Sequence, residues 1–319
     1  MEFERLVGPE RRLLLAHCHR MLGSNADAED ALQEALVRAW TGIDKWEKRS
    51  SLRTWLVRIA TNASIDLATR RGPRVMPHQS GSPLAAGEPP DAPKPEVPWL
   101  EPAPADLLDE SAASPEATVT SRESLGIAFL AAIQRLPPQQ RAVLLLRDVL
   151  GWSASEVADL LETSVAAVNS ALQRARATMD RPSKPPTMMA PPPEDDSIRA
   201  LLTRYTAAWE SGAPELFANV LREDAILTMP PMAAWMQGPA SIIALVQFIH
   251  ARMGAIRMIP ARTASGPSLA GYLRAPGDQL FRASGIHVLS VEGDRVIESH
   301  AFIVPHLFER FGLPATLEP

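Results

Sequence analysis

Residues 153–177 read SASEVADLLETSVAAVNSALQRARA, and this stretch decides the fold of the first half of the chain. Apolar residues recur at helical spacing on both sides of a short break at residues 162–164. They are Val157, Ala158 and Leu161 before the break and Val168, Leu172 and Ala175 after it. Ser164 or Thr163 can cap the second helix. Two short helices joined by so tight a turn predict a helix-turn-helix, whose second helix enters the major groove of DNA.

The outer face of that second helix carries side chains that suit a major groove. Asn and Gln pair with adenine edges, and Arg pairs with guanine or with phosphate. The residues that we expect to contact DNA are Ala167, Asn169, Ser170, Gln173, Arg174 and Arg176. From this segment alone, an ordinary helical hairpin with a solvated outer face is the alternative.

The N-terminal part, residues 1–72, is predicted to be helical throughout. Between Ala28 and Trp40 the apolar residues follow a helical period and should form an inner face, opposite an acidic and polar face. Asp27 can cap this helix, because the first turn favours anions. A second helix begins near Ser51, and Gly72-Pro73 ends it. We therefore expect an all-α domain over residues 1–75.

Two Pro-rich segments separate the predicted domains. Residues 76–118 are rich in Pro, Ala and Gly with scattered acids, and carry a net charge of about −7 with one lysine, Lys94. Such a composition predicts an extended linker that does not fold alone. The Pro-rich run PSKPPTMMAPPPEDD, at 182–196, predicts a second tether over residues 183–196. Between them, residues 119–182 form the second all-α domain, with one helix expected over 121–136 and another over 139–149.

Residues 197–319 change character. Helices are predicted at 197–211, 214–221 and 239–252, and strands at 225–229, 258–264, 268–274, 279–291 and 295–304. Glu292-Gly293-Asp294 predicts a hairpin turn between the last two strands. This pattern indicates an α+β unit, with helices packed on a curved antiparallel sheet.

The bulk composition limits the class of protein. Apolar residues make up 46% of the chain and charged residues 22%, which argues against global disorder. The charged N-terminus lacks a signal peptide, and no apolar run reaches membrane-spanning length, so we expect a cytoplasmic protein without membrane partners. The single cysteine, Cys18, is expected to be a small core residue. The net charge of −5 does not exclude DNA binding, because residues 1–75 carry about +3.

Three segments, taken in order, resemble the extracytoplasmic-function group of sigma-70-type RNA polymerase sigma factors. They are DAEDALQEALVRAW (27–40), SLRTWLVRIATNASIDLATRR (51–71) and LPPQQRAVLLLRDVLGWSASEVADLL (136–161). The resemblance covers about residues 1–182. It implies that residues 1–75 are region 2 and residues 119–182 region 4. It also implies that the protein binds core RNA polymerase and promoter DNA, directs initiation at −10 and −35 elements, and is not an enzyme.

The resemblance assigns roles to individual residues. The polymerase-binding residues would be Asp27, Asp30, Gln33, Glu34 and Arg38. The −10 element would contact Trp46, Arg49, Ser51, Arg53, Arg58, Asn62, Arg70 and Arg71, whereas the spacing of Trp55 favours a core position. The helix-turn-helix residues given above would read the −35 element. Glu162 replaces a usual glycine in the turn, and Asn169 replaces a frequent basic residue, which predicts a weaker −35 grip.

The C-terminal part resembles the SnoaL-like branch of NTF2-like α+β cones, through residues 198–231 and 235–242. The resemblance implies a domain that regulates the sigma factor in cis, with a pocket that can hold a small-molecule ligand. The candidate pocket residues are Tyr205, Trp209, Asp224 and His287. The fold class is therefore two all-α domains, an acidic Pro-rich linker and an NTF2-like cone, with no cofactor and no metal expected. A DNA-binding regulator fused to an isomerase- or cyclase-type enzyme is the alternative, and a repressor that acts without polymerase is a third reading.

Overall fold

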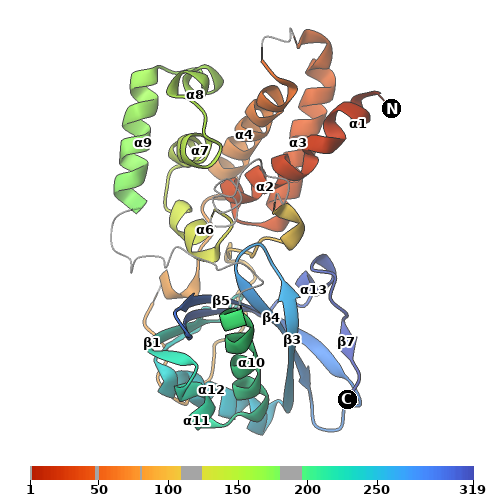
Figure 1. The fold of residues 1–319 in the computed structure, drawn as a ribbon, viewed down its shortest axis with the longest axis vertical. Coiled ribbons are helices and arrows are strands. Elements are labelled where there is room, and N and C mark those ends of the chain that lie inside the picture. Colours follow the sequence, from red (N-terminus) through yellow and green to blue (C-terminus); the bar gives the residue numbers. More distant parts are fainter. Residues whose placement is uncertain (1, 47–49, 80, 109–123, 180–195) are drawn as a thin grey trace. The chain divides into compact units, whose positions relative to one another are not determined.

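A computed structural model describes residues 2–46, 50–79, 81–108, 124–179 and 196–319. The chain divides into two compact units. The first, which we call the helical unit, comprises residues 1–74 and 100–186; the second, the cone unit, comprises residues 75–99 and 187–319. Each unit is described by itself (Figure 1).

The N-terminal part of the helical unit is a helix bundle. Its elements are α1 (Glu2–Val7), α2 (Arg11–Leu22), α3 (Asn25–Gly42) and α4 (Leu52–Arg71), of which the last three pack against one another. Gly23, at φ 65°, ends α2 in the left-handed region. Ser24 then caps α3 by accepting a hydrogen bond from the Asp27 N–H. The prediction that Asp27 is the cap was therefore wrong, since the cap is Ser24, three residues earlier.

The second part of the helical unit contains the helix-turn-helix. α6 (Ile127–Ile133) is followed by α7 (Pro138–Leu144), a π-helical turn (Leu145–Val149), α8 (Ala154–Leu160) and α9 (Val165–Met179). The helix predicted over 121–136 is shorter, since the described residues before 127 form a turn and residues 121–123 lie outside the described ranges. Arg141 of α7 is buried and donates to the Met21 and Ile133 carbonyls, which fixes α7 to the end of α2.

The predicted linker does not behave as one free segment. Residues 75–99 belong to the cone unit, where Met76 is buried and Leu84 packs against the core. The Leu84 N–H donates to the Trp235 carbonyl at 2.8 Å, and the Lys94 N–H donates to the Pro231 carbonyl at 2.8 Å. Val75 and Trp99 form a β-bridge that closes this segment into a loop.

The rest of the described linker belongs to the helical unit. Leu100, Ala103 and Leu107 are buried there, and the Asn25 N–H donates to the Glu101 carboxylate at 2.6 Å. Residues 109–118 lie outside the described ranges. The low apolar content of residues 76–118 predicted an extended tether, but the few apolar side chains present find partners that lie far away in the sequence.

The cone unit is a sheet covered by helices. Its strands are β1 (Leu221–Thr228), β2 (Trp235–Gln237), β3 (Ala255–Arg262), β4 (Pro267–Arg274), β5 (Phe281–Glu292), β6 (Arg295–Phe302) and β7 (Thr316–Leu317). The order is β2-β1-β6-β5-β4-β3, and β7 pairs with β5. β1 runs parallel to β6, so the sheet is mixed rather than wholly antiparallel as predicted. The β5–β6 hairpin turns where it was predicted, with Glu292 opposite Arg295.

Helices close the cone over a buried core. They are α10 (Asp196–Ser211), α11 (Pro214–Ala218), α12 (Pro239–Arg252) and α13 (Leu307–Arg310). α10 packs on β3 and β4, and α12 packs on β1, β2 and β3 (Figure 1). Tyr205, Phe217 and Val246 are among the core residues that this packing buries. The predicted α+β architecture is confirmed.

Candidate nucleic-acid interface and cone cavity

The helix-turn-helix presents an open outer face. Ser153 and Glu156 form a reciprocal capping box at the start of α8, and Ser164 accepts from the Ala167 N–H at the start of α9. α9 buries Val168, Leu172 and Ala175, as the spacing predicted. The six residues predicted to contact the −35 element all lie exposed: Ala167, Asn169, Ser170, Gln173, Arg174 and Arg176.

The turn between α8 and α9 is tight although it lacks a glycine. Glu162 has φ 53°, and among the described residues it is the sole non-glycine in the left-handed region. The Thr163 N–H donates to the Ala158 carbonyl at 2.9 Å, which closes the end of α8. A residue with a Cβ is strained in this conformation by about 1 kcal/mol. Glutamate in place of the usual glycine therefore lowers the stability but leaves the turn tight.

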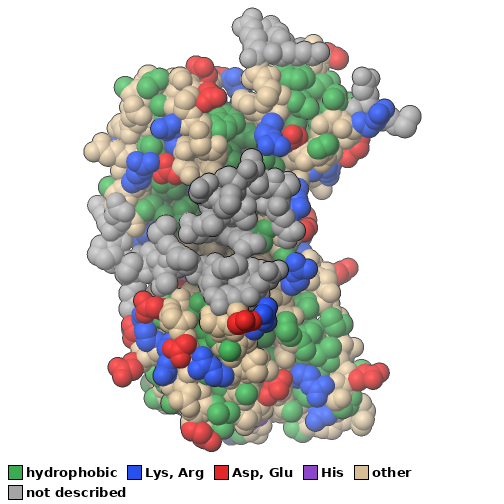
Figure 2. Space-filling view, in the orientation of Figure 1, with side chains coloured by type: hydrophobic (Ala, Val, Ile, Leu, Met, Phe, Trp, Pro, Cys, Tyr) green, Lys and Arg blue, Asp and Glu red, His purple; other side chains and the backbone are tan. Residues whose placement is uncertain are grey.

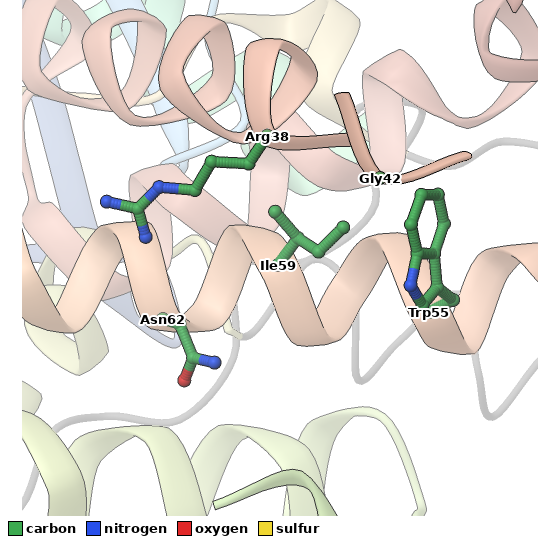
Figure 3. Close-up of a pocket in the computed structure, with 5 residues that line it drawn as sticks. All are labelled: Arg38, Gly42, Trp55, Ile59 and Asn62. Atoms are coloured by element: carbon green, nitrogen blue, oxygen red, sulfur yellow. The ribbon is translucent and has the colours of Figure 1, made fainter. Parts of the chain in front are cut away.

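A groove runs between α3 and α4. Its first section, a pocket of about 320 Å³, is lined by Arg38, Gly42, Trp55, Ile59 and Asn62 (Figure 3). Further sections are lined by Asp30, Glu34, Asp66, Arg70 and Arg71. The groove therefore brings together residues predicted to bind polymerase with residues predicted to bind the −10 element. Gln33 lies exposed on α3 but is not among the lining residues.

Trp55 lies at one end of the pocket, below Gly42 (Figure 3). It is half-buried and stacks on Trp46, with ring centroids 6.0 Å apart and planes at 24°. The indole N–H of Trp46 is buried without a hydrogen-bond partner among the described residues. The expectation that Trp55 is a core residue is only partly met, since one of its faces borders the groove.

The arginines predicted to contact the −10 element are paired within the chain. Arg53 bonds to Glu10 at 2.8 Å and Arg58 bonds to Glu162 at 2.9 Å. The Arg70 guanidinium donates to the Asp66 carbonyl of its own helix at 3.3 Å. Ser51 caps α4 by accepting from the Thr54 N–H. Arg49 lies outside the described residues.

Asp27 does not belong to a contact surface. Its carboxylate is 3% exposed and forms ion pairs with Arg71 and Arg74. Arg71 also bonds to Asp30 at 3.1 Å. A buried carboxylate held by two guanidinium groups fastens the start of α3 to the end of α4. The assignment of Asp27 to polymerase binding was wrong, because this side chain is inaccessible to a partner.

Sequence reasoning missed two exposed apolar residues on α3. Val37 and Trp40 are each 60% exposed, and the Trp40 ring contacts Phe3 edge-on at 5.3 Å. With Gln33 they lie at positions i, i+4 and i+7, which places them on one stripe of the helix. The periodicity assigned Trp40 to the inner face. The adjacent Ala39 is the buried residue at this end of α3. Because neighbouring residues on a helix point in different directions, its place on the inner face could have indicated that Trp40 lies off that face.

The surface charge is mixed. Among the coloured side chains on the face in Figure 2, basic and acidic groups are interspersed rather than gathered by sign. Arg176 on α9 pairs with Asp148 at 2.6 Å, and Arg174 bonds to the Ser170 hydroxyl at 2.6 Å. Both of these basic groups on α9 are therefore already bonded within the chain.

The cone unit encloses a small cavity of about 40 Å³. Trp209 and His287 line it, and Tyr205 lies directly behind His287, with its hydroxyl 3.2 Å from Nδ1 and 2.7 Å from the Ser299 hydroxyl. Burial lowers the pKa of His287 to about 3, so the imidazole is neutral at physiological pH. Burial also raises the pKa of Tyr205.

Asp224 lies elsewhere. It is partly exposed on β1 and pairs with Arg222 at 2.5 Å. The expectation that Asp224 lines the pocket was wrong, because it is not among the residues that line the cavity. Asp224 and Arg222 lie two residues apart on β1, so their side chains share one face of the strand and can pair there. His300 is also held apart from the cavity, by a bond from Thr228 at 2.9 Å.

The described ranges contain no cluster of three or more His, Cys, Asp or Glu side chains placed to hold a metal ion. No helix within them is at once long and apolar enough to cross a bilayer.

Comparisons with known proteins agree with this arrangement. The family model for sigma-70 region 2 matches residues 6–74, and that for sigma-70 region 4 matches residues 127–179. The ECF RNA polymerase sigma factor SigG of Mycobacterium tuberculosis is 43% identical over 99% of this chain and 85% of its own length. SigW of Bacillus subtilis is 30% identical over 51% of this chain and 78% of its own length.

The crystal structure of the M. tuberculosis sigma factor SigJ has the same fold. It superposes with a TM-score of 0.62 at 22% identity, over 98% of this chain and 99% of that chain. The alignment includes the cone unit as well as both helical parts. The ordered helical regions, the helix-turn-helix and the full-length similarity to SigG lead to one conclusion: this chain belongs to the extracytoplasmic-function family of sigma-70-type RNA polymerase sigma factors.

Proposed function

We propose how this sigma factor divides promoter recognition among its residues. α9 reads the −35 element through Asn169, Gln173 and Arg174. The observation that carries the proposal is that this face is exposed, and that Asn169 and Gln173 make no side-chain hydrogen bond with any described residue. Their donors and acceptors are therefore available to base edges without first leaving another partner.

The groove between α3 and α4 receives the opened −10 element. Strand opening without ATP requires unstacked bases to be captured, and aromatic faces beside polar groups capture them. Trp46 and Trp55 supply the aromatic faces, and Asn62 supplies an amide at the other end of the pocket. A pocket of about 320 Å³ is large enough for one base.

α3 docks on core RNA polymerase with its exposed apolar stripe. Val37 and Trp40 provide apolar area, and Asp30, Gln33 and Glu34 provide a polar margin. Exposed apolar side chains with a polar margin are typical of a protein-binding helix. Asp27 takes no direct part in this contact.

The cone unit regulates initiation in cis and acts in the cytoplasm without catalysing a reaction. Two observations support this. Residues 75–99, which are part of the segment between region 2 and region 4 in the sequence, pack against the rest of the cone unit through Leu84 and Lys94. Among its described lining residues the cavity has His287 but no carboxylate to pair with it as acid and base in proton transfer. The fused-enzyme alternative is not favoured.

The decisive experiment is run-off transcription with core polymerase. The full chain is compared with a chain that ends at Arg181 and with the full-length variant Leu84→Ser, which loosens the docked loop but keeps the cone unit. If the cone unit inhibits by holding the loop, both variants initiate more strongly than the full chain. If it is a required part of the holoenzyme, both initiate less. Equal activity of all three proteins contradicts regulation in cis.

A second experiment separates polymerase binding from DNA binding. Trp40→Ala is expected to weaken co-purification with core polymerase, whereas Asn169→Ala is not. Both changes lie on exposed faces, so neither should alter the melting temperature by more than about 2–4 °C. Unchanged polymerase binding by Trp40→Ala contradicts the assigned stripe.

A further inference from the structure

The cavity of the cone unit has walls that are almost entirely apolar. Met229, Ile249, Ile256, Leu273, Ala301 and Ile303 line it. None of its described lining residues is charged. A charged ligand would have to lose its hydration without gaining an ionic partner, and this costs many times what the apolar contacts return. The walls therefore select an uncharged molecule.

Tyr272, Ser284 and His287 supply the polar side chains among the described lining residues, and the Tyr272 hydroxyl already donates to the Pro314 carbonyl. Nε2 of His287 lies 3.6 Å from where a Cβ on Gly271 would stand, and Gly271 itself lines the cavity. His287 is 5% exposed, and its one hydrogen bond is made by the opposite ring nitrogen, Nδ1. Nε2 therefore has no hydrogen-bond partner among the described residues, and most of the wall around it is apolar. Such groups carry a cost unless something bonds to them.

The buried hydrogen bonds determine which ring nitrogen carries the proton. Ser299 and Tyr205 are both buried, and the hydroxyl of Ser299 bonds to no described residue except Tyr205. Each hydroxyl proton finds an acceptor in one arrangement: Ser299 donates to Tyr205, and Tyr205 donates to Nδ1 of His287. In the reverse direction the Ser299 proton has no acceptor. With Nδ1 accepting, the neutral imidazole carries its proton on Nε2.

The Trp209 ring lies in the same wall. The indole N–H of Trp209 is buried and completes no hydrogen bond with a described residue, although it is near enough to the Tyr205 oxygen to lower the pKa of that hydroxyl. The Trp209 and His287 rings meet edge to face at 4.7 Å. The Trp209 N–H is buried beside Tyr205, so the N–H donor available to a ligand is Nε2–H of His287. A molecule that supplies an acceptor satisfies this donor.

We propose that this cavity binds a small, uncharged, largely apolar molecule that carries a carbonyl oxygen, and that the oxygen accepts a hydrogen bond from Nε2–H of His287. The volume of about 40 Å³ limits the size of the ligand. A buried water needs about 10–15 Å³ of such space, so there is room for roughly three waters or a molecule of a few non-hydrogen atoms. The inference does not depend on how the cone unit affects transcription.

The test uses the full chain labelled with ¹⁵N and follows the indole N–H cross-peak of Trp209 by NMR. The cross-peak is assigned with Trp209→Phe. The probe is 2-butanone, and its match is 2-methyl-1-butene, in which a CH₂ group replaces the carbonyl oxygen. Propionate serves as the charged comparison. We expect a saturable shift with 2-butanone, roughly tenfold weaker binding of 2-methyl-1-butene, and no shift with propionate.

Gly271→Ala is the informative variant. Its added methyl would lie 3.4 Å from the Gly285 carbonyl oxygen, an ordinary contact, so the fold tolerates it while the space beside Nε2 is filled. We expect its affinity for 2-butanone to fall by roughly tenfold or more, and that of His287→Phe to fall similarly. Equal affinities for 2-methyl-1-butene and 2-butanone would overturn the proposed hydrogen bond. An unchanged affinity of Gly271→Ala for 2-butanone would overturn the proposed location beside Nε2. The absence of any shift of the Trp209 cross-peak would overturn the binding site itself.

Discussion

The two helices that carry the promoter contacts are built in opposite ways. α4 buries eight side chains, and three of its arginines, Arg53, Arg58 and Arg71, bond to acids elsewhere in the helical unit. α9 buries three side chains, and Asn169 and Gln173 on its outer face have no side-chain partner among the described residues. An arginine on α4 must exchange a carboxylate for a phosphate when it binds DNA. Its net contribution to the binding free energy is therefore only the difference between the two ion pairs. Asn169 and Gln173 on α9 need no such exchange, whereas Arg176 on the same helix is paired with Asp148.

The largest effect is expected where α4 is fastened to α3. Asp27→Ala leaves the guanidinium groups of Arg71 and Arg74 without their buried partner, and should destabilise the helical unit by about 3–5 kcal/mol. Asp30→Ala is the control, because its side chain is 55% exposed and its pair with Arg71 is worth under about 1 kcal/mol. Urea unfolding followed by circular dichroism measures both. Similar midpoints for the two variants would mean that the pair at Asp27 is not structural.

A second effect tests the interior of α4 through pH. His17 is buried and bonds to Thr61 of α4 at 2.9 Å, and burial, aided by the nearby Arg20 charge, lowers the pKa of His17 to about 3. The unfolded chain binds a proton below its ordinary pKa of about 6.5, whereas the folded chain does not until about 3. Stability should therefore fall by up to about 1.4 kcal/mol per pH unit from this residue as the pH drops through that range.

The variant His17→Gln keeps a hydrogen bond to Thr61 but cannot titrate. Its unfolding free energy should depend less steeply on pH between about 6.5 and 4 than that of the unchanged chain. Parallel slopes for the two proteins would show that the histidine is protonated in the folded state.

The third prediction concerns specificity rather than stability. Asn169→Ala should change the unfolding free energy by no more than about 0.5 kcal/mol, because the side chain is exposed and unbonded. Its preference for the correct base in the −35 element should fall by about 1–3 kcal/mol. Competition between templates that differ at single −35 positions gives this quantity directly. A uniform loss at all positions would make Asn169 a phosphate contact instead.

The smallest effect is expected at the turn. Glu162→Gly should stabilise the helical unit by about 1 kcal/mol, because glycine adopts a positive φ without strain. Glu162→Ala retains the strain and loses only the pair with Arg58, in which the two side chains are 41% and 82% exposed. The difference between the two variants isolates the backbone term. If the Glu162→Ala and Glu162→Gly variants have the same melting temperature, the turn is not strained.

Elements with a strong internal period were predictable from the sequence. The helix at Pro239–Arg252 agrees with the prediction because its apolar residues repeat within the element itself. The last hairpin agrees because its turn residues are adjacent in the sequence. The exposed face of α9 followed from the same reasoning. These features depend on neighbours in the chain, which the sequence displays directly.

The features that were mispredicted depend on distant partners. Asp27 and Asp30 look alike in the sequence, and only the fold brings Arg74, from beyond the end of α4, to the first. Residues 75–99 carry too few apolar side chains to fold alone, and the cone unit supplies the rest of the burial for Leu84 and Met76. Composition measures what a segment can bury by itself and not what a partner contributes.

The single cysteine has a practical consequence. Cys18 is fully buried in α2, and burial raises the pKa of its thiol to about 12. The native thiol is therefore nearly unreactive toward maleimides and spin-label reagents in the folded protein. A cysteine introduced at exposed Ala167 or Gln33 would be labelled selectively without removing Cys18. A chain that carries both introduced cysteines is thus suited to fluorescence or electron-spin distance measurements between α3 and α9 during initiation.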